Sequence, residues 1–216
     1  MIRSNFRAWN LDQVEEAFGL KQVWQMPLLE EWTTFSYDIS NYERQYLLQT
    51  QNLFRLGGDD WNEAELENKF ISPVITFSGI DNERFAYFLE RELSATINDY
   101  ELSGKVDGMI ATGFRSPKKP YFCLANGSPM RYKRGSDPNG DPKGQALIAM
   151  LVAQHINANN QPIFGSYIIG RNWYFMVLIG NQYAISNDYS CMDDELFDIY
   201  RILQGLRVLI EKQIDL

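Results

Sequence analysis

Apolar residues follow two different periods along this chain, and the change of period separates predicted helices from predicted strands. Where they recur every three or four residues, one face of a helix would be apolar, and we predict an amphipathic helix. Ser40 and Asn62 stand where an N-cap is expected, and Gly19 stands where a helix would end. The predicted helices cover residues 11–18, 41–56, 63–77, 143–157 and 193–213.

Short apolar runs with alternating stretches fill much of the middle of the chain, and turn-forming residues separate them. Such runs predict strands. Ser103-Gly104 is predicted as one turn, and residues 125–143 hold most of the other turn formers, beginning with Asn126-Gly127. The predicted strands cover residues 85–97, 105–112, 121–124, 164–169, 173–178 and 181–185.

The order of these elements predicts a mixed sheet flanked by helices, in the α/β or α+β class. Residues 1–57 are expected to form a helical N-terminal extension, because Gly57-Gly58-Asp59-Asp60 interrupts the helical pattern. Residues 58–216 are expected to form the core. A chain of 216 residues is long enough to bury a sizeable core, so extension and core are expected to make one compact unit.

Charge is distributed unevenly along the chain. The net charge of −8 argues against a general nucleic-acid binder. Residues 114–145 nevertheless carry seven basic side chains against two acidic ones, a local charge of +5. This segment could contact phosphates, or it could be a solvated loop, and the sequence leaves both readings open.

The sequence predicts neither a membrane-spanning segment nor a secretory signal. The apolar runs are far shorter than the ~20 residues that span a bilayer, and the first residues lack the apolar stretch of a secretory signal. Cys123 and Cys191 are too few for a disulfide scaffold. We therefore expect a cytoplasmic protein with no membrane partner.

Three short motifs occur in a fixed order, and together they carry a resemblance to a known family. They are Asn62-Glu63-Ala64-Glu65-Leu66-Glu67, Gly104-Lys105-Val106-Asp107-Gly108 and Pro142-Lys143-Gly144-Gln145-Ala146-Leu147. In this order, the first at the start of a helix, the second in a strand and the third at the start of a later helix, they resemble the PD-(D/E)XK nuclease superfamily. The resemblance covers residues 59 to about 212 and is closest to uncharacterised bacterial members with a helical N-terminal extension. It implies a restriction-endonuclease-like fold.

The resemblance also implies a chemistry, the Mg²⁺-dependent hydrolysis of phosphodiesters. Such hydrolysis needs a divalent metal, and Mg²⁺ prefers oxygen ligands, including one or two carboxylates. By the resemblance, Asp107 would hold the metal, Lys133 would orient the attacking water and Gln145 would position the site. Glu63 and Glu67 lie four residues apart on one helix face, and one of them would assist through water.

The Glu-x-Lys element of the family is where this chain departs, and two registers are open. If the strand that begins at 121 continues, Asn126 takes the Glu position and Ser128 the Lys position. If the strand resumes after a turn, Arg131 takes the Glu position and Lys133 keeps the Lys position. We favour the second register, because its lysine lies at a more family-like spacing from Gln145.

Neither register supplies a carboxylate. Arg131 would repel a metal, since like charges ~4 Å apart cost on the order of 4 kcal/mol. Asp137 or Asp141 could instead fold back as the missing ligand.

Two functions therefore remain open. The first is a Mg²⁺-dependent nuclease, or its catalytically impaired descendant, that contacts nucleic acid through the basic segment 115–134. The second is a non-catalytic protein-binding or regulatory protein on the same fold, with the acidic N-terminal helices facing a protein partner. DNA or RNA preference and oligomeric state stay open. The nucleic-acid contacts predicted under the first function are Arg115, Lys118, Lys119, Arg131 and Arg134.

Overall fold

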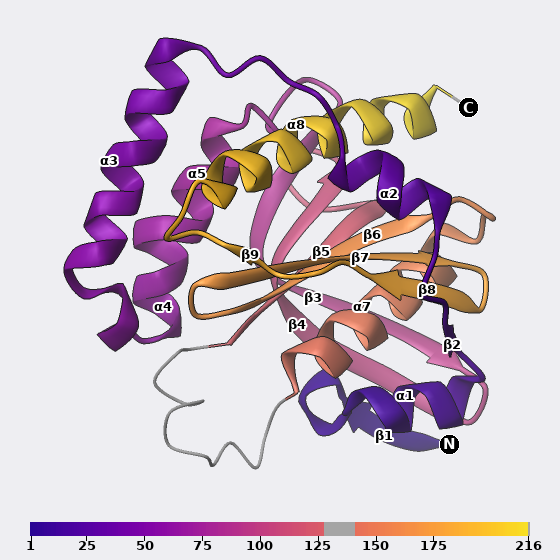
Figure 1. The fold of residues 1–216 in the computed structure, drawn as a ribbon. Helices are drawn as coiled ribbons and strands as arrows, with labels where there is room; N and C mark the ends of the chain where they lie inside the picture. Colours follow the sequence, from indigo (N-terminus) through magenta and orange to yellow (C-terminus); the bar gives the residue numbers. More distant parts are fainter. Residues whose placement is uncertain (128–140, 216) are drawn as a thin grey trace.

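The described residues form a mixed sheet of nine strands, with helices packed on both of its faces (Figure 1). The structure is a computed structural model that describes residues 1–127 and 141–215. The predicted mixed sheet flanked by helices is thereby confirmed. The strands are β1 (Ile2–Asn5), β2 (Lys21–Gln22), β3 (Phe85–Ile97), β4 (Tyr100–Thr112), β5 (Pro120–Gly127), β6 (Ile163–Ile169), β7 (Asn172–Ile179), β8 (Gln182–Ile185) and β9 (Tyr189–Ser190).

Helical elements precede, interrupt and follow the strands. None of the described helices has the length and apolar character needed to cross a bilayer. They are η1 (Phe6–Ala8), α1 (Leu11–Phe18), α2 (Pro27–Thr33), α3 (Asn41–Gly57), η2 (Gly58–Asp60), α4 (Glu63–Leu66), the π-helical segment η3 (Glu67–Ile71), α5 (Ser72–Phe77), α7 (Pro142–Asn157) and α8 (Glu195–Ile214).

The strand order is β1-β4-β5-β6-β7-β8-β2, with β3 paired to β4 and β9 paired to β7. Strands β3, β4 and β5 form antiparallel pairs, whereas β5 and β6 run parallel. A parallel pair needs a crossover connection, and α7 lies in the connection between β5 and β6. The centre of the molecule therefore has the order helix, three antiparallel strands, helix, parallel strand.

Two hydrophobic clusters lie on the two faces of this sheet, because successive residues of a strand point to opposite faces. Ile110 and Phe122 belong to the first cluster, with Leu203 of α8. Met109 and Cys123, their neighbours in the chain, belong to the second, with Leu147 of α7. Figure 1 shows α8 and α2 covering one face, and α7 and α1 covering the other.

The first 57 residues are part of this arrangement rather than an addition to it. Strand β1 pairs in parallel with β4, and β2 pairs in parallel with β8. Trp32 and Phe54 are fully buried in the same cluster as Leu203. Residues on both sides of the predicted boundary at Gly57 thus share one core, and the predicted helical extension contributes two strands to the sheet.

The predicted turn at Ser103-Gly104 is wrong. Strand β4 already begins at Tyr100, and the chain turns at Asn98, whose φ of +53° is left-handed. Gly104 is instead needed for packing, because a Cβ there would lie 2.5 Å from the ring of Phe6.

The turn predicted at Asn126-Gly127 is wrong as well. Strand β5 continues through both residues, and Asn126 pairs with Ile168 of β6. A long-range partner strand overrides the local turn preference of these two residues.

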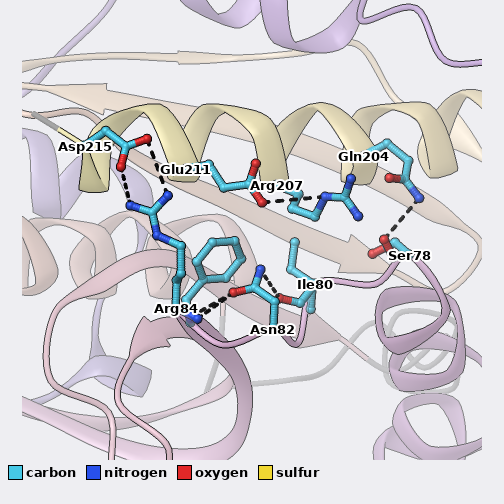
Figure 2. A network of polar contacts seen from close by, with 9 residues as sticks. Ser78, Ile80, Asn82, Arg84, Gln204, Arg207, Glu211 and Asp215 are labelled. Carbon is cyan, nitrogen blue, oxygen red and sulfur yellow. Dashed lines mark hydrogen bonds and ion pairs between the residues drawn. The ribbon is translucent and has the colours of Figure 1, made fainter.

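A polar network anchors α8 to the connection between α5 and β3 (Figure 2). Gln204 donates from Nε2 to the carbonyl of Ser78 at 3.0 Å, and Arg84 pairs with Asp215 at the end of α8. The Asn82 side chain accepts the backbone N–H groups of Arg84 and Phe85. These contacts fix the start of β3, the strand that carries Tyr87 into the site described next.

Candidate carboxylate site between β4, β5 and the α4–α5 helix

Asp107 lies on β4 and is partly buried beside β5. Its Oδ2 accepts the backbone N–H of Asn126 at 2.6 Å. The pKa of Asp107 is raised to about 7, with burial as the largest cause; the Asn126 N–H acts to lower the pKa, and the charges of Glu67, Glu90 and Glu63 act to raise it. The residue predicted as the metal ligand is therefore a poorly solvated carboxyl group surrounded by other carboxylates.

Glu67 is the second carboxylate of this cluster. Its Oε1 accepts the hydroxyl groups of Ser72 at 2.6 Å and of Tyr87 at 3.1 Å. Burial nevertheless raises the pKa of Glu67, because these two hydrogen bonds only partly offset the loss of hydration. Its Oε2 is buried and has no hydrogen-bond partner among the described residues.

The helix that carries Glu67 widens into a π-helical turn at this residue. The backbone N–H of Ser72 donates to the carbonyl of Glu67, five residues back. Pro73 follows, and it has no N–H with which to continue an α-helical ladder. Single π turns inside α-helices occur frequently at functional sites. The predicted helix over 63–77 is thus continuous through α4, η3 and α5, with its irregular turn at the carboxylate.

Tyr87 of β3 contacts Glu67 and lies beside the residue that follows Asp107. Its hydroxyl lies against Gly108, the residue after Asp107, so that a Cβ at Gly108 would overlap it. Burial raises the pKa of Tyr87 well above its ordinary value, and the charge of Glu67 adds to this rise. The phenol therefore stays protonated and donates to Glu67. Glycine at 108 is the residue type that allows this close approach.

Asn126 closes the cluster from the side of β5. Its Nδ2 donates to the carbonyl of Glu63 at 3.3 Å, which ties β5 to the first turn of α4. Its Oδ1 is buried and has no donor among the described residues. An unsatisfied buried acceptor costs about 1–3 kcal/mol. The site thus has two buried acceptor oxygens without a donor among the described residues, one on Glu67 and one on Asn126.

Glu90 brings a further carboxylate to the site, and the sequence analysis missed it. Its φ of +53° is left-handed, a backbone strain of about 1–3 kcal/mol for a residue other than glycine. The pairs Leu89↔Gly108 and Arg91↔Val106 leave Glu90 opposite Asp107. No local pattern in the sequence indicates a left-handed residue inside this strand.

Lys105 is the cation closest along β4 to Asp107, and it too was missed. It lies two residues before Asp107, so the two side chains point to the same side of the strand. Its Nζ is 3.9 Å from a carboxylate oxygen of Glu90. The i, i+2 spacing within the strand was a usable signal for this residue.

The other predicted site residues divide into those placed elsewhere and those not described. Gln145 lies in the first turn of α7, and no described contact joins its side chain to Asp107 or Glu67. Strand β5 continues through Asn126, as required by the first register, in which Asn126 takes the Glu position of the Glu-x-Lys element. Arg131, Lys133 and Arg134, on which the second register depends, lie outside the described residues, as do Ser128 and Asp137.

Asp141 does not replace the missing ligand. One of its oxygens accepts the N–H of Lys143 at 3.1 Å, and the other accepts the N–H of Leu11 at 3.0 Å. This carboxylate thus caps α7 and holds the start of α1.

The described part of the basic segment lies away from the carboxylates. Arg115, Lys118 and Lys119 belong to the loop between β4 and β5, next to Pro120. Asn126 is at the other end of β5, a distance of about 20 Å at the usual rise of a strand. The structure therefore does not bring these three cations to the Asp107 site.

Chemically, Asp107, Glu67 and Asn126 offer two carboxylates and an amide oxygen from three elements. No group of three or more His, Cys, Asp or Glu side chains suited to a metal ion occurs within residues 1–127 and 141–215. Oxygen donors of this kind suit a hard cation such as Mg²⁺ better than a soft one.

The chain matches neither a known protein-family model nor a curated protein sequence.

Proposed function

We propose that this chain is a PD-(D/E)XK-like protein on a restriction-endonuclease-like fold. Its Asp107–Glu67 site would bind Mg²⁺, and its nuclease activity would be impaired or lost. The observation that carries this proposal is that Asp107 of β4 accepts the N–H of Asn126 of β5, while the charge of Glu67, on the α4–α5 helix, acts on Asp107 and helps to raise its pKa. The fold assignment is supported by the order of elements along the chain, which is a helix, three antiparallel strands, a second helix and a strand parallel to β5.

The electrostatics of the site support cation binding. Two carboxyl groups with raised pKa values stand near each other, and a divalent cation would favour the charged form of both. Asp107 and Glu67 would hold the ion, and the Asn126 amide oxygen would complete its protein ligands. When bound, Mg²⁺ would neutralise phosphate charge and lower the pKa of a bound water.

Impaired hydrolysis follows from what stands in place of the Glu-x-Lys element. In the first register Asn126 occupies the Glu position, and its amide oxygen is neutral where the family has a negative charge. Lys105 stays beside Glu90, from where it could contribute positive charge near a phosphate. We therefore expect metal binding to survive better than catalysis.

Calorimetric titration of Mg²⁺ and Mn²⁺ at pH 8 tests this proposal. We expect binding by the native chain, loss of binding in Asp107→Ala and at least tenfold weaker binding in Glu67→Gln. Asp38→Asn, an exposed carboxylate between α2 and α3, is the matched control and should bind like the native chain. Absence of binding by the native chain would overturn the metal site.

Nuclease assays on single- and double-stranded DNA and RNA test the second half of the proposal. We expect slow cleavage or none, and any cleavage should disappear with Asp107→Ala. Efficient, Asp107-dependent cleavage would show that the site is fully active and that the proposed impairment of nuclease activity is wrong.

A second candidate, a non-catalytic protein-binding protein, is favoured by exposed aromatic side chains in the N-terminal segment. Trp24 is 89% exposed next to β2, the last strand in the order of the sheet, and Tyr42 is 72% exposed on α3. If this function is the right one, Trp24→Ser and Tyr42→Ser should abolish capture of a partner that Asp107→Ala still binds.

A further inference from the structure

The loop between β4 and β5, residues 113–119, is a second candidate binding surface. It carries Arg115, Lys118 and Lys119 and no acidic residue. Phe114, which precedes these three cations, is 69% exposed. The rest of the chain has a charge of −11, because the whole chain has −8 and this loop has +3. The loop therefore combines an exposed aromatic ring with a charge opposite to that of the rest of the protein.

Backbone hydrogen bonds fix the shape of this loop. The carbonyl of Thr112 accepts the N–H of Lys118 at 2.8 Å, and the N–H of Thr112 donates to the carbonyl of Lys119 at 3.1 Å. The Thr112 hydroxyl also accepts the N–H of Lys119 at 3.2 Å. Gly113 has a left-handed φ of +99°, and a Cβ there would overlap the carbonyl oxygen of Ser116. The loop is thus ordered before a ligand arrives, which reduces the entropy lost on binding.

The charged and aromatic side chains of the loop have no partners among residues 1–127 and 141–215. Arg115, Lys118 and Lys119 form no ion pair and no side-chain hydrogen bond with those residues. The ring of Phe114 makes no aromatic or cation–π contact with them either. All four side chains are exposed and therefore accessible to a ligand.

The segments beside the loop add little negative charge. Asn157, near the end of α7, donates to the carbonyl of Pro120 at 2.6 Å, and residues 156–162 carry no charge. On the side of β3, Asp81 accepts a backbone N–H on the edge of the strand that faces away from β4. Glu83 is the other exposed acid before β3, and no acidic residue lies within the loop itself. The tip of the loop is thus a positive surface on an acidic protein.

We propose that this loop binds single-stranded nucleic acid, with Phe114 stacking on a base and Arg115, Lys118 and Lys119 contacting phosphates. Stacking on aromatic side chains combined with cations along the backbone binds single strands with little dependence on sequence. The base faces of a duplex are already stacked. A duplex or a flat anionic membrane would also extend beyond the loop and bring negative charge within about 10 Å of the acidic remainder of the protein, where salt screens repulsion only partly.

A flexible single strand, by contrast, can follow the loop alone. This proposal does not rest on the proposed Mg²⁺ site, because Asp107 and Glu67 take no part in it. It adds a contact surface at the end of β5 opposite to Asn126.

Fluorescence anisotropy with labelled oligothymidine and oligouridine of about 15 nucleotides tests this inference. The buffer contains EDTA, so that a metal at Asp107 cannot contribute. We expect a dissociation constant of about 0.1 mM at low salt, and three phosphate contacts predict a slope of about −2 for log affinity against log salt. A duplex of the same length should bind about fivefold more weakly, because its bases cannot stack on Phe114.

Vesicles of phosphatidylserine and phosphatidylcholine are the third probe, and the protein should not sediment with them. Equal or tighter binding of the duplex, sedimentation with the vesicles, or no binding of either oligonucleotide at about 1 mM protein would overturn the proposal.

Substitutions in the loop assign the contacts. Phe114→Leu keeps an apolar side chain but lacks a ring, so it should weaken binding about tenfold, whereas Phe114→Tyr keeps the ring and should bind like the native chain. Lys118→Gln should weaken binding about threefold and reduce the salt slope by about 0.7. Lys21→Gln, which changes an exposed lysine on β2, is the matched control and should alter neither. Native affinity in Phe114→Leu, or an unchanged salt slope in Lys118→Gln, would contradict the assignment.

Discussion

Two glutamates of this protein, Glu43 and Glu67, accept hydrogen bonds from the same kinds of group but end in opposite electrostatic states. Glu43 accepts the hydroxyls of Tyr37 and Tyr200, and Glu67 accepts those of Ser72 and Tyr87. Burial acts to raise the pKa of both. Hydrogen bonds outweigh burial at Glu43, whose pKa is lowered, whereas burial wins at Glu67, whose pKa is raised.

Glu67 is much more deeply buried than Glu43, and the two residues also differ in where they stand in their helices. Glu43 is at the third position of α3, where its Oε2 accepts the backbone N–H of Ser40 and completes a capping box. Glu67 is inside a helix, where it meets no free backbone N–H, and its Oε2 has no partner among the described residues. Glu43 thus has the surroundings of a structural carboxylate, and Glu67 those of one available to a ligand.

The largest expected difference is in the unfolding free energy that is lost when each of the two carboxylates is removed. Glu43→Ala takes the acceptor from two tyrosine hydroxyls and from Ser40, so we expect a loss of about 3 kcal/mol of unfolding free energy. Glu67→Ala also removes a poorly solvated charge, so we expect a change within about 1 kcal/mol. Urea unfolding at pH 7 measures both. An equal loss in the two variants would make Glu67 a structural residue as well.

Asp107, in the same site as Glu67, should make the stability of the protein depend on pH. Because its pKa in the folded protein, about 7, lies above the ordinary 3.8, the folded state binds this proton more tightly. The resulting stability is fully present below about pH 4 and is lost as the pH rises through 7. The shift corresponds to about 4 kcal/mol, and partial solvation of the site reduces the expected effect to about 2 kcal/mol.

Asp107→Asn makes this dependence measurable. The variant keeps an oxygen that can accept the Asn126 N–H but cannot carry a charge. Urea unfolding between pH 5 and 8 should therefore show the native chain losing about 2 kcal/mol relative to the variant. Parallel pH profiles of the two proteins would rule out Asp107 as the titrating group.

Added Mg²⁺ should act on the Asp107 site and not on Glu43. At 10 mM Mg²⁺ and a dissociation constant of about 1 mM, we expect the native chain to gain about 1.4 kcal/mol at pH 8. For a chain of this size that gain corresponds to about 3–6 °C in Tm. Asp107→Ala should gain nothing, and a sodium chloride control of equal ionic strength separates binding from screening. A gain of the same size in Asp107→Ala would place the ion elsewhere.

The smallest expected effect concerns the strained backbone of Glu90. Glycine adopts a left-handed φ freely, so Glu90→Gly should stabilise the fold by about 0.5–1 kcal/mol. Glu92→Gly, two residues along β3, should destabilise it by a similar amount, because that position is ordinary strand. Thermal unfolding compares the two. Destabilisation by both substitutions would mean that contacts of the Glu90 side chain outweigh its backbone strain.

Local chemistry accounts for the parts of the fold that the sequence predicted well. The N-caps at Ser40 and Asn62 and the left-handed Gly19 lie where they were expected. Each of these signals depends on residues only a few positions apart. For the same reason β3, with its long alternating pattern, was predicted with its observed ends.

The candidate site was predictable only in part. Asp107 and Glu67 were both named from the sequence, and the structure brings them to one cluster with Asn126. Gln145 and the cations at 115–119 do not join them among the described contacts. The sequence pattern could assign these residues to a helix or a loop. It could not predict which end of β5 that helix or loop would lie against.

By itself, the sequence determined the helices, their caps and the alternation of apolar positions that builds the sheet, because these features arise from neighbouring residues. Only the tertiary structure decided the partners. It drew β1 and β2 into the sheet, extended β5 through Asn126 along β6, and placed Glu90 opposite Asp107. These outcomes depend on strand pairing and burial between residues far apart in the chain. The same burial gives Asp107 and Glu67 their raised pKa values, which no local pattern encodes.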